Sequence, residues 1–386
     1  MFAEHVTPGP IVMFGSGETS PSGRKIFESA FRHLPENPRV ALIETPAGFE
    51  LNSSQVIGRV GEFIKHRLQN YRPRIEIVPA RKRGTDFSPN NPEILEPLYR
   101  ADMIFMGPGS PTYAVRQLSD SLAWGVILAR HRLGKVLTLA SAAVIAISAY
   151  ALPVYEIYKV GDELHWKEGL NLFAQYGLQL IFIPHWNNND GGEELDTSRC
   201  FMGQERFNGL IELLPQNHTV IGIDEKTGLV VDPQTGRCDV VGLGSVTLIH
   251  KGQLHAGAFS ASELQEAGLE QVVDNLNAHV HKFASGETFS LSRLGFYRAP
   301  GPGEGLPSEI WQSVLDQHQA EQGRMDEETA LPGAVIRLVE QREKAREQKD
   351  FTTADRLRNE LDEMGWRVKD TQAGPVVEKV SQDNGR

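Results

Sequence analysis

The chain has few cysteines. Only Cys200 and Cys238 occur among its 386 residues, too few for the disulfide framework of a small secreted protein. No C-x-x-C pattern is present, which excludes the usual zinc-ribbon and thioredoxin-like motifs. We therefore expect neither structural disulfides nor a cysteine-ligated metal, and the sequence implies no metal or organic cofactor.

Positive charge is also scarce. The formal net charge of −11 argues against general affinity for nucleic acid or for an anionic membrane, although it leaves room for a local basic site. The first five residues lack the basic segment and the apolar segment of a signal peptide. We therefore expect a cytoplasmic protein.

Long hydrophobic runs are almost absent. Residues 136–152 carry no charge and reach the lower limit of length for a membrane span, but they include Thr138, Ser141 and Ser148. No second run of this kind occurs. We predict that this run is buried in the core and that the chain has no membrane partner.

The chain does contain a regular alternation of apolar strands and amphipathic helices. This alternation is typical of βαβ units, and it predicts an α/β fold with three layers around a mostly parallel sheet. Short strands and tight turns between 220 and 249 predict an antiparallel extension of that sheet, and a helix over 262–284 is expected to close the domain. The other predicted strands are 10–14, 39–43, 75–78, 102–106 and 178–184; the predicted helices are 21–33, 53–68, 92–99, 114–118 and 199–214; residues 155–166 are predicted to form a short hairpin.

One Ser lies at a sharp strand–helix junction. The apolar run from Val136 passes through Ser141, which has small neighbours, and continues as an apolar helix over 144–149. In a nucleophile elbow, such a corner lifts the Ser oxygen out of the sheet and beside the amide N–H groups of a helix N-terminus. The usual elbow has Gly two residues before and two after the Ser, where this chain has Leu139 and Ala143. The alternative is a buried junction whose Ser caps the helix.

Residues that follow the strands carry the functional information, because ligands of open parallel sheets bind beyond the carboxyl ends of the strands. His185 follows one predicted strand, and Asp224 and Glu225 follow another. With Ser141 they make a Ser/His/acid set, in which the base takes the Ser proton and the acid holds the imidazole. The alternative is a hydrogen-bonded structural His and a pair of turn acids.

Two strand ends are rich in glycine. Residues 107–110 (Gly-Pro-Gly-Ser) lie beside the predicted elbow, where exposed amides could form half of an oxyanion hole; a plain turn is the alternative. Residues 15–17 (Gly-Ser-Gly) lack the third glycine of a dinucleotide fingerprint and the Lys of a phosphate loop. We predict that this second loop is a tight turn without a ligand.

Residues from about 10 to 290 resemble the S51 family of serine peptidases, which includes cyanophycinase and dipeptidase E. Residues 139–144 (Leu-Ala-Ser-Ala-Ala-Val) match the family's Gly-Thr-Ser-Ala-Gly-Ala in register, and residues 107–110 are similar to its Gly-Gly segment. The most specific match is at 222–227 (Gly-Ile-Asp-Glu-Lys-Thr), followed by 241–244 (Val-Gly-Leu-Gly).

The resemblance implies a fold of the flavodoxin or glutamine amidotransferase type. It implies that Ser141, His185 and Glu225 form a catalytic triad that acts through an acyl-enzyme on a peptide or amide substrate. It also implies that the backbone amides of Gly109 and Ala142 form the oxyanion hole.

The same resemblance suggests how substrate is bound. The spaced arginines that follow the family's His fall on Arg199 and Arg206, which are expected to bind a substrate carboxylate, and Asn187 in the expanded loop is a further substrate-binding candidate. Because the elbow glycines are replaced, the pocket should differ from that of cyanophycinase or be inactive. Cys200 is not at the elbow, which disfavours a cysteine-dependent glutamine amidotransferase.

The C-terminal part has a second resemblance, to the C-terminal helical piece of cysteinyl-tRNA synthetases. Residues 345–358 follow its pattern Ala-Arg-x-x-Lys-Asp-Phe-x-x-Ala-Asp-x-x-Arg, and Asp370-Thr371 and Gly374 end it. We predict a hairpin of two helices, over 335–348 and 352–364, with a short strand at 365–368.

These observations divide the chain into parts. We predict a peptidase-like domain over 8–290, a linker over 291–330, the synthetase-like hairpin over 331–377 and a disordered tail over 378–386. In the synthetases this piece lies at the tRNA-contacting end, but acidic and basic residues nearly balance here. We slightly favour a hairpin that docks on a partner or on the main domain, and a homodimer stays open.

The sequence thus predicts a serine peptidase or amide hydrolase. The competing hypothesis is a non-catalytic protein that keeps the fold and uses its hairpin to contact tRNA or a protein partner.

Overall fold

The computed structural model describes residues 6–251, 269–273, 278–329, 333–371 and 374–379. The chain forms two compact units, Met1–His318 and Gln319–Arg386, which we call the first and second units and describe separately. Among the described residues, no helix has both the length and the apolar character needed to cross a bilayer.

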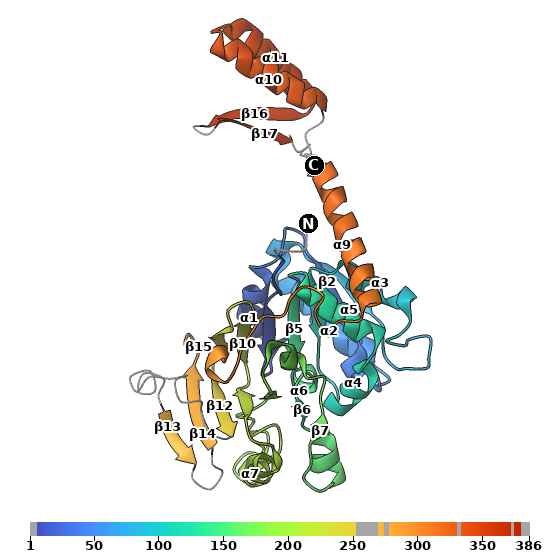
Figure 1. The fold of residues 1–386 in the computed structure, drawn as a ribbon, viewed down its shortest axis with the longest axis vertical. Helices are drawn as coiled ribbons and strands as arrows, with labels where there is room; N and C mark the ends of the chain where they lie inside the picture. Colours follow the sequence, from blue (N-terminus) through green and yellow to red (C-terminus); the bar gives the residue numbers. More distant parts are fainter. Residues whose placement is uncertain (1–5, 252–268, 274–277, 330–332, 372–373, 380–386) are drawn as a thin grey trace. The chain divides into compact units, whose positions relative to one another are not determined.

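The first unit is built on a sheet of eight strands in the order β15-β11-β10-β1-β5-β4-β2-β3 (Figure 1). The five strands from β1 to β3 in this order run parallel, and β10, β11 and β15 add an antiparallel edge. The predicted α/β class and mostly parallel sheet are therefore confirmed. The strands are β1 Ile11–Phe14, β2 Arg39–Ile43, β3 Arg74–Val78, β4 Met103–Met106, β5 Val136–Ala140, β10 Thr227–Asp232, β11 Arg237–Gly242 and β15 Thr288–Ser290.

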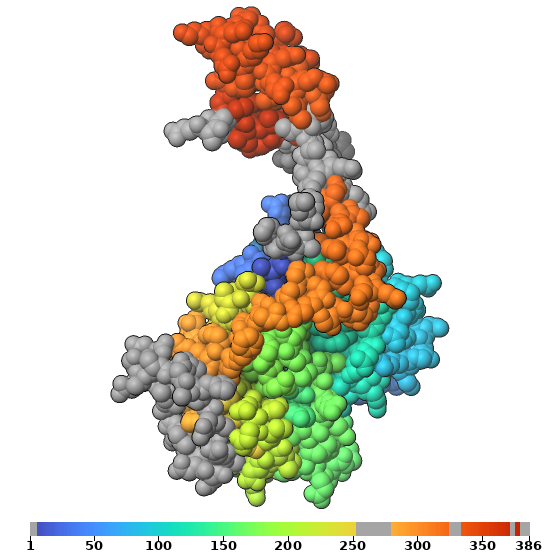
Figure 2. Space-filling model, in the orientation of Figure 1, coloured from blue at the N-terminus to red at the C-terminus, as the bar shows by residue number. Residues whose placement is uncertain are grey.

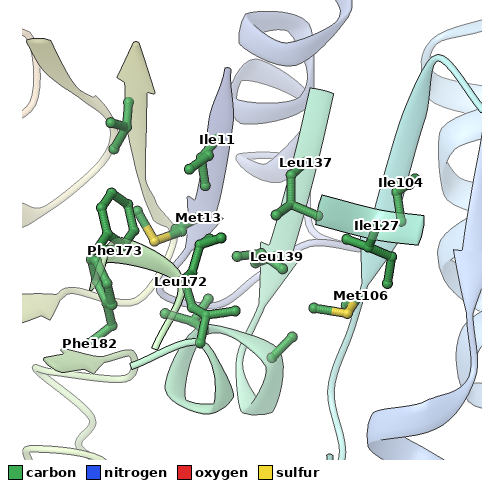
Figure 3. Packing of buried hydrophobic residues seen from close by; sticks show 14 of the residues in the cluster. Ile11, Met13, Ile104, Met106, Ile127, Leu137, Leu139, Leu172, Phe173 and Phe182 are labelled. Carbon is green, nitrogen blue, oxygen red and sulfur yellow. The ribbon is translucent and has the colours of Figure 1, made fainter. Parts of the chain in front are cut away.

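Both faces of this sheet are covered. In β1, Val12 and Phe14 face one hydrophobic cluster, while Ile11 and Met13 face another, as the two-residue period of a strand requires. The first cluster includes side chains of α1 Gly23–Phe31 and α2 Ser53–Arg67. The second includes side chains of α5 Leu122–Arg132, and Figure 3 shows Ile127 of α5 beside Met106 and Leu137 of the sheet. Central strands of this kind have continuous apolar sequences because neither face of the sheet meets water.

A second sheet carries part of the site. Its order is β13-β14-β12-β9-β8, with β8 and β9 parallel and the other pairs antiparallel. The predicted helix over 262–284 is wrong where the structure describes it, because β14 pairs with β12 from Ser245↔Ala284 to Lys251↔Ala278; residues 262–268 and 274–277 lie outside the described part. Pairing across the sheet overrides local helical character. The strands are β8 Leu180–Ile183, β9 His218–Ile223, β12 Ser245–Lys251, β13 Leu269–Val273 and β14 Ala278–Ala284.

The structure of residues 155–166 also differs from the predicted short hairpin. The two-residue strands β6 Tyr150–Ala151 and β7 Lys167–Glu168 pair with each other, and a π-helical turn, η5 Glu156–Val160, lies between them.

The uncharged run at 136–152 is divided among β5, α6 and β6, and its apolar side chains are almost all buried. The remaining helices of this unit are α3 Glu96–Arg100, α4 Pro111–Leu118, α6 Ala142–Ala146 and α7 Gly203–Leu213, with 3₁₀ turns η2 Thr45–Ala47, η3 Gln69–Tyr71, η4 Pro92–Leu95, η6 Leu172–Tyr176 and η8 Leu291–Arg293.

The segment predicted as a linker is structured in part. It contains η8 and the helix α9 Ser308–Thr329. Val314 of α9 is fully buried in the first unit, and Ile310 packs against Gly125 of α5. The Gly/Pro-rich turn before α9 is held by buried Arg132, which donates to the carbonyl oxygens of Gly301 and Glu304. The division of the chain into domains stays a prediction, but residues up to 318 cluster with the first unit.

The second unit is small. Helices α10 Gly333–Glu347 and α11 Phe351–Glu363 pack together, and β16 Trp366–Thr371 pairs with β17 Gly374–Lys379. Its buried apolar core includes Val335, Leu361 and Val368. The predicted C-terminal helices are confirmed, and the predicted short strand is part of β16. Of the predicted tail, residues 378 and 379 belong to β17, and 380–386 lie outside the described part.

Candidate active site

Ser141 occupies the corner between β5 and α6. Its backbone has φ 51° and ψ −114°, a region that non-glycine residues adopt only when the surrounding fold imposes it. Leu139 and Ala143, which replace the usual elbow glycines, are both fully buried. The Ser141 side chain makes no helix-capping hydrogen bond, so the alternative of a plain capping Ser does not describe this junction.

His185 lies two residues after β8 and faces Ser141. The Ser141 Oγ–His185 Nε2 distance is 3.1 Å, and the His185 Nδ1–Glu225 Oε1 distance is 3.0 Å. The backbone N–H of His185, whose φ is 53°, donates to the carbonyl of Gly15 at 2.9 Å. The loop at 15–17 therefore holds the backbone of His185, a role that the sequence did not suggest.

Glu225 is the acid that reaches His185. The hydrogen bond from His185 is the main reason why the pKa of Glu225 lies below its ordinary value, with a further contribution from Asn188, whose Nδ2 donates to the same carboxylate at 3.2 Å. Asp224, the other candidate, is buried and accepts hydrogen bonds from the backbone and hydroxyl of Ser245. A carboxylate held ionised beside Nδ1 favours the tautomer with Nδ1–H, which leaves Nε2 free to accept from Ser141.

A cavity of about 400 Å³ opens beside Ser141. Gly109 and Ala142 line it, and among the described residues neither backbone N–H has a hydrogen-bond partner. Gly109 has φ 145°, and a Cβ there would lie 1.9 Å from the carbonyl oxygen of Pro46, so this position requires glycine. The lining residues are Gly109, Pro111, Ser141, Ala142, Ile145, Val154, Tyr155, Tyr158, Lys159, His185, Cys200 and Phe201.

The predicted substrate-binding residues do not line this cavity. The Arg199 guanidinium stacks 4.6 Å from the ring of Trp186 and donates to Gln204. Arg206 donates to the carbonyl oxygens of residues 201 and 202. Asn187 accepts a hydrogen bond from the backbone N–H of Glu225 at 2.7 Å and so positions the acid. The substrate contacts of these three residues stay predictions.

The turn before α7 differs from the predicted helix start. Helix α7 begins at Gly203, four residues later than predicted. Arg199, Cys200 and Phe201 all have left-handed φ values, of 57°, 58° and 69°, which a right-handed helix cannot include. In this turn the Cys200 N–H donates to the carbonyl of His185 at 3.1 Å. Burial raises the pKa of the Cys200 thiol to about 12, so the thiol stays protonated at neutral pH.

Sequence reasoning missed the aromatic and basic wall of the cavity. Tyr155, Tyr158 and Lys159 line it from η5. Their spacing of three and four residues places side chains on one face of a helix, and this spacing is the sequence signal that indicates a shared wall. This segment is instead predicted from the sequence as a hairpin. Among the described residues, no cluster of three or more His, Cys, Asp or Glu is suited to a metal ion.

Comparison with known proteins separates the two units. Residues 328–374 match the family model of the cysteinyl-tRNA ligase anticodon binding domain. The cysteine–tRNA ligase of Methanosarcina mazei is 47% identical over 52 residues, which are 14% of this chain and 11% of the relative. That of Caldicellulosiruptor saccharolyticus is 40% identical over 67 residues, 17% of this chain and 13% of the relative. The chain thus spans only about a tenth of the length of these relatives, and the C-terminal resemblance is confirmed.

The structural comparison concerns the larger part of the chain. The crystal structure of a peptidase from an acI-B1 Actinobacterium has a TM-score of 0.54 and 21% sequence identity, over 75% of this chain and 99% of that chain. At this identity the likeness shows a shared fold. The peptidase-type α/β fold that the resemblance implied is therefore confirmed.

Proposed function

We propose that the first unit is a serine-type peptidase or amide hydrolase with Ser141 as nucleophile, His185 as general base and acid, and Glu225 as the residue that orients the imidazole. The observation that carries the proposal is the unbroken set of hydrogen bonds from Ser141 Oγ through His185 to Glu225, at 3.1 and 3.0 Å, beside a cavity. Both distances are within the range from which a base can take a proton. The peptidase that shares the fold supports the same reaction class.

In this proposal, His185 Nε2 takes the Ser141 proton while Oγ bonds to the substrate carbonyl carbon. The resulting oxyanion accepts hydrogen bonds from the N–H groups of Gly109 and Ala142, each contributing of the order of 3 kcal/mol to the transition state. The imidazolium then gives its proton to the leaving nitrogen as the C–N bond breaks. Water attacks the acyl-enzyme, His185 takes its proton and returns it to Ser141 Oγ, and the carboxylic acid leaves.

A fluorophosphonate probe tests this function, because it bonds covalently to an activated Ser Oγ. We expect wild-type protein to be labelled at Ser141, as located by mass spectrometry of the peptides, and Ser141→Ala to remain unlabelled. Cys200→Ser is the matched control, since Cys200 lines the same cavity without contacting His185 through its side chain, and it should keep the label. Equal absence of label in wild type and Ser141→Ala would favour a non-catalytic binding protein.

The second unit supports a separate candidate function, contact with tRNA. The match of residues 328–374 to an anticodon binding domain favours it. Arg337 and Lys344 of α10 are exposed, make no ion pair among the described residues, and are seven residues apart, which places them on one face of the helix. These two cations are therefore candidates to meet a phosphate backbone.

A gel shift with bulk tRNA at two salt concentrations tests this contact. Binding should weaken as salt rises, and Arg337→Glu combined with Lys344→Glu should abolish it. The matched control is Arg356→Ala, whose guanidinium already pairs with Glu360. If the double variant binds as wild type does, docking on a protein partner becomes the better reading of this unit.

A further inference from the structure

One wall of the cavity is formed by a π-helical turn that is firmly held. Its second residue, Ile157, is 4% exposed, and the Glu156 carboxylate accepts a hydrogen bond from Thr112 Oγ1 at 2.6 Å. The ring of Tyr158 packs 5.3 Å from that of Phe201. The hydroxyl of Tyr155 donates to the carbonyl oxygen of Gly109 at 3.4 Å. Side chains on this turn are therefore fixed relative to the proposed oxyanion hole.

The charge of this wall is not balanced within the cavity. Of the residues that the structure describes, Lys159 is the one Lys or Arg that lines the cavity, and no Asp or Glu lines it. The Lys159 ammonium lies 5.5 Å from the centre of the Tyr155 ring, and among the described residues it has no carboxylate within ion-pair distance.

The nearby acids are engaged elsewhere or lie outside the lining. The Glu156 carboxylate accepts from Thr112, and Glu225 accepts from His185 and Asn188. Glu50 acts electrostatically on Tyr155 but does not line the cavity. The Lys159 side chain is exposed, and an ammonium without a counter-ion at the edge of a cavity attracts an anion.

Resting on the proposed function, we propose that Lys159 is the residue that selects substrates carrying a carboxylate, by pairing with that carboxylate while the scissile carbonyl lies at Ser141. The rings of Tyr155 and Tyr158 form the apolar walls along which the stem of the carboxylate-bearing group packs. In this proposal Lys159 has a carboxylate-binding role like the one that the resemblance implied for Arg199 and Arg206. A cavity of about 400 Å³ suits a small substrate.

A peptide substrate has two sources of carboxylate, an acidic side chain on the acyl side of the scissile bond and a free C-terminus on the leaving side. The shared chemistry is the anion, and the experiment separates the two. Figure 2 shows that the segment around η5, in green, reaches the outer surface beside α7, in yellow-green, and the Arg206 guanidinium of α7 lies 5.8 Å from the Tyr158 ring. Either end of a short substrate can therefore approach this wall from solvent.

The test compares labelling rates of Ser141 by matched fluorophosphonates on the full-length protein. One pair carries a carboxylate or its carboxamide on the alkyl group bonded to phosphorus, to represent the acyl side. A second pair carries the same groups on the alkoxy substituent, to represent the leaving side. We expect the acid of one pair to label wild type about tenfold faster than its amide, the size expected of a charge-assisted contact near solvent.

The variants then assign the preference to one side chain. Lys159→Met, which keeps the apolar stem, should remove the preference for the acid, Lys159→Arg should keep it, and Lys159→Glu should reverse it. Lys167→Met, an exposed lysine in β7 outside the lining, is the matched control. The amide probes should still label Ser141 in every variant, and at the wild-type rate in Lys167→Met, which shows that the fold and Ser141 are intact.

Each outcome decides between the proposals. A preference that disappears only in Lys159→Met and Lys159→Glu supports the inference, and the responding probe pair identifies the source of the carboxylate. Equal rates for acid and amide in wild type, or a preference that persists in Lys159→Met, overturn it while leaving the hydrolase intact. If no probe labels Ser141, the proposed function fails and Lys159 loses its role with it.

Discussion

The two units fix a constrained residue by different interactions, hydrophobic packing in the first unit and an ion pair in the second. In the first unit, Ser141 keeps a left-handed backbone at the end of a fully buried strand, with a large hydrophobic cluster on each face of the sheet. In the second, Arg342 is 4% exposed and pairs in bidentate fashion with Asp370 at 3.0 Å over a small apolar core.

This difference shows what each kind of site requires. A strained residue persists only where the surrounding packing determines its conformation, and a large core supplies that packing. A small unit has less apolar surface to bury, so ion pairs carry a larger share of its specificity. The comparison can be tested by weakening each means of support separately.

The largest effect should come from Glu225→Gln. The amide keeps the shape of the side chain but cannot stabilise the imidazolium, and we expect the rate of Ser141 labelling, or of hydrolysis, to fall about 10³-fold. The measurement is kcat/KM or the labelling rate constant at neutral pH. Thr235→Ala, in the exposed turn after β10, is the control, and a loss below about tenfold in Glu225→Gln would contradict the proposed role.

The same variant has a pH signature in stability. Because the pKa of Glu225 in the folded chain lies below its ordinary value of 4.5, the ionised carboxylate stabilises the fold above that pH. This contribution is lost as the pH falls through the lower, folded-state pKa. The difference in free energy of unfolding between wild type and Glu225→Gln should therefore shrink as the pH falls below the ordinary value of 4.5, as measured by denaturant unfolding.

The next effect is on packing beneath the elbow. Leu139→Ala removes a fully buried side chain of β5 and should lower the free energy of unfolding of the first unit by about 2–5 kcal/mol. Leu51→Ala is the matched control, since Leu51 is fully exposed and should change stability by less than about 0.5 kcal/mol. Similar values for the two variants would show that the core does not support the elbow as described.

A smaller effect is expected in the second unit. Asp370→Asn removes one of the two carboxylates that pair with the buried Arg342 guanidinium, the other being that of Glu343, and should destabilise this unit by about 1–2 kcal/mol, since Asp370 itself is half exposed. Hydrogen exchange of α10 and α11 measures it. Labelling of Ser141 should be unchanged, and a parallel loss of labelling would show that the two units depend on each other.

The smallest effect is expected at an exposed pair of the same unit. Arg356 and Glu360 of α11 are 3.5 Å apart, with side chains 67% and 46% exposed. Arg356→Ala should change the free energy of unfolding by less than about 0.5 kcal/mol. A loss as large as that of Asp370→Asn would mean that exposed pairs, and not the buried guanidinium, stabilise this hairpin.

Local features of the fold and the candidate site could be predicted where neighbouring residues cause them. The apolar run before Ser141 and the small residues after it indicated a strand, a turn and a helix, and these are β5 and α6. His185 and Glu225 stood at strand ends and do converge on Ser141; their catalytic roles stay predictions.

Features that depend on distant partners could not be predicted. The contacts of Arg199 with the Trp186 ring and of Arg206 with a backbone carbonyl could not be predicted, because a sequence shows a charge but not its partner in space. Residues 278–284 are predicted as helix but form β14. Their partner strand β12 lies more than 25 residues earlier in the chain, so local sequence does not indicate the pairing. Lys159 was missed because the fold, and not its neighbours in sequence, brings η5 to the cavity.

The sequence by itself determined the alternation of parallel strands and helices up to β5, the Ser at the corner and the C-terminal hairpin, since each follows from apolar period, turn residues and capping within a few positions. Only the tertiary structure decided which charges meet a partner and which face the cavity. The physical reason is that burial and pairing depend on distances through space, which a folded chain sets by packing elements that are far apart in sequence.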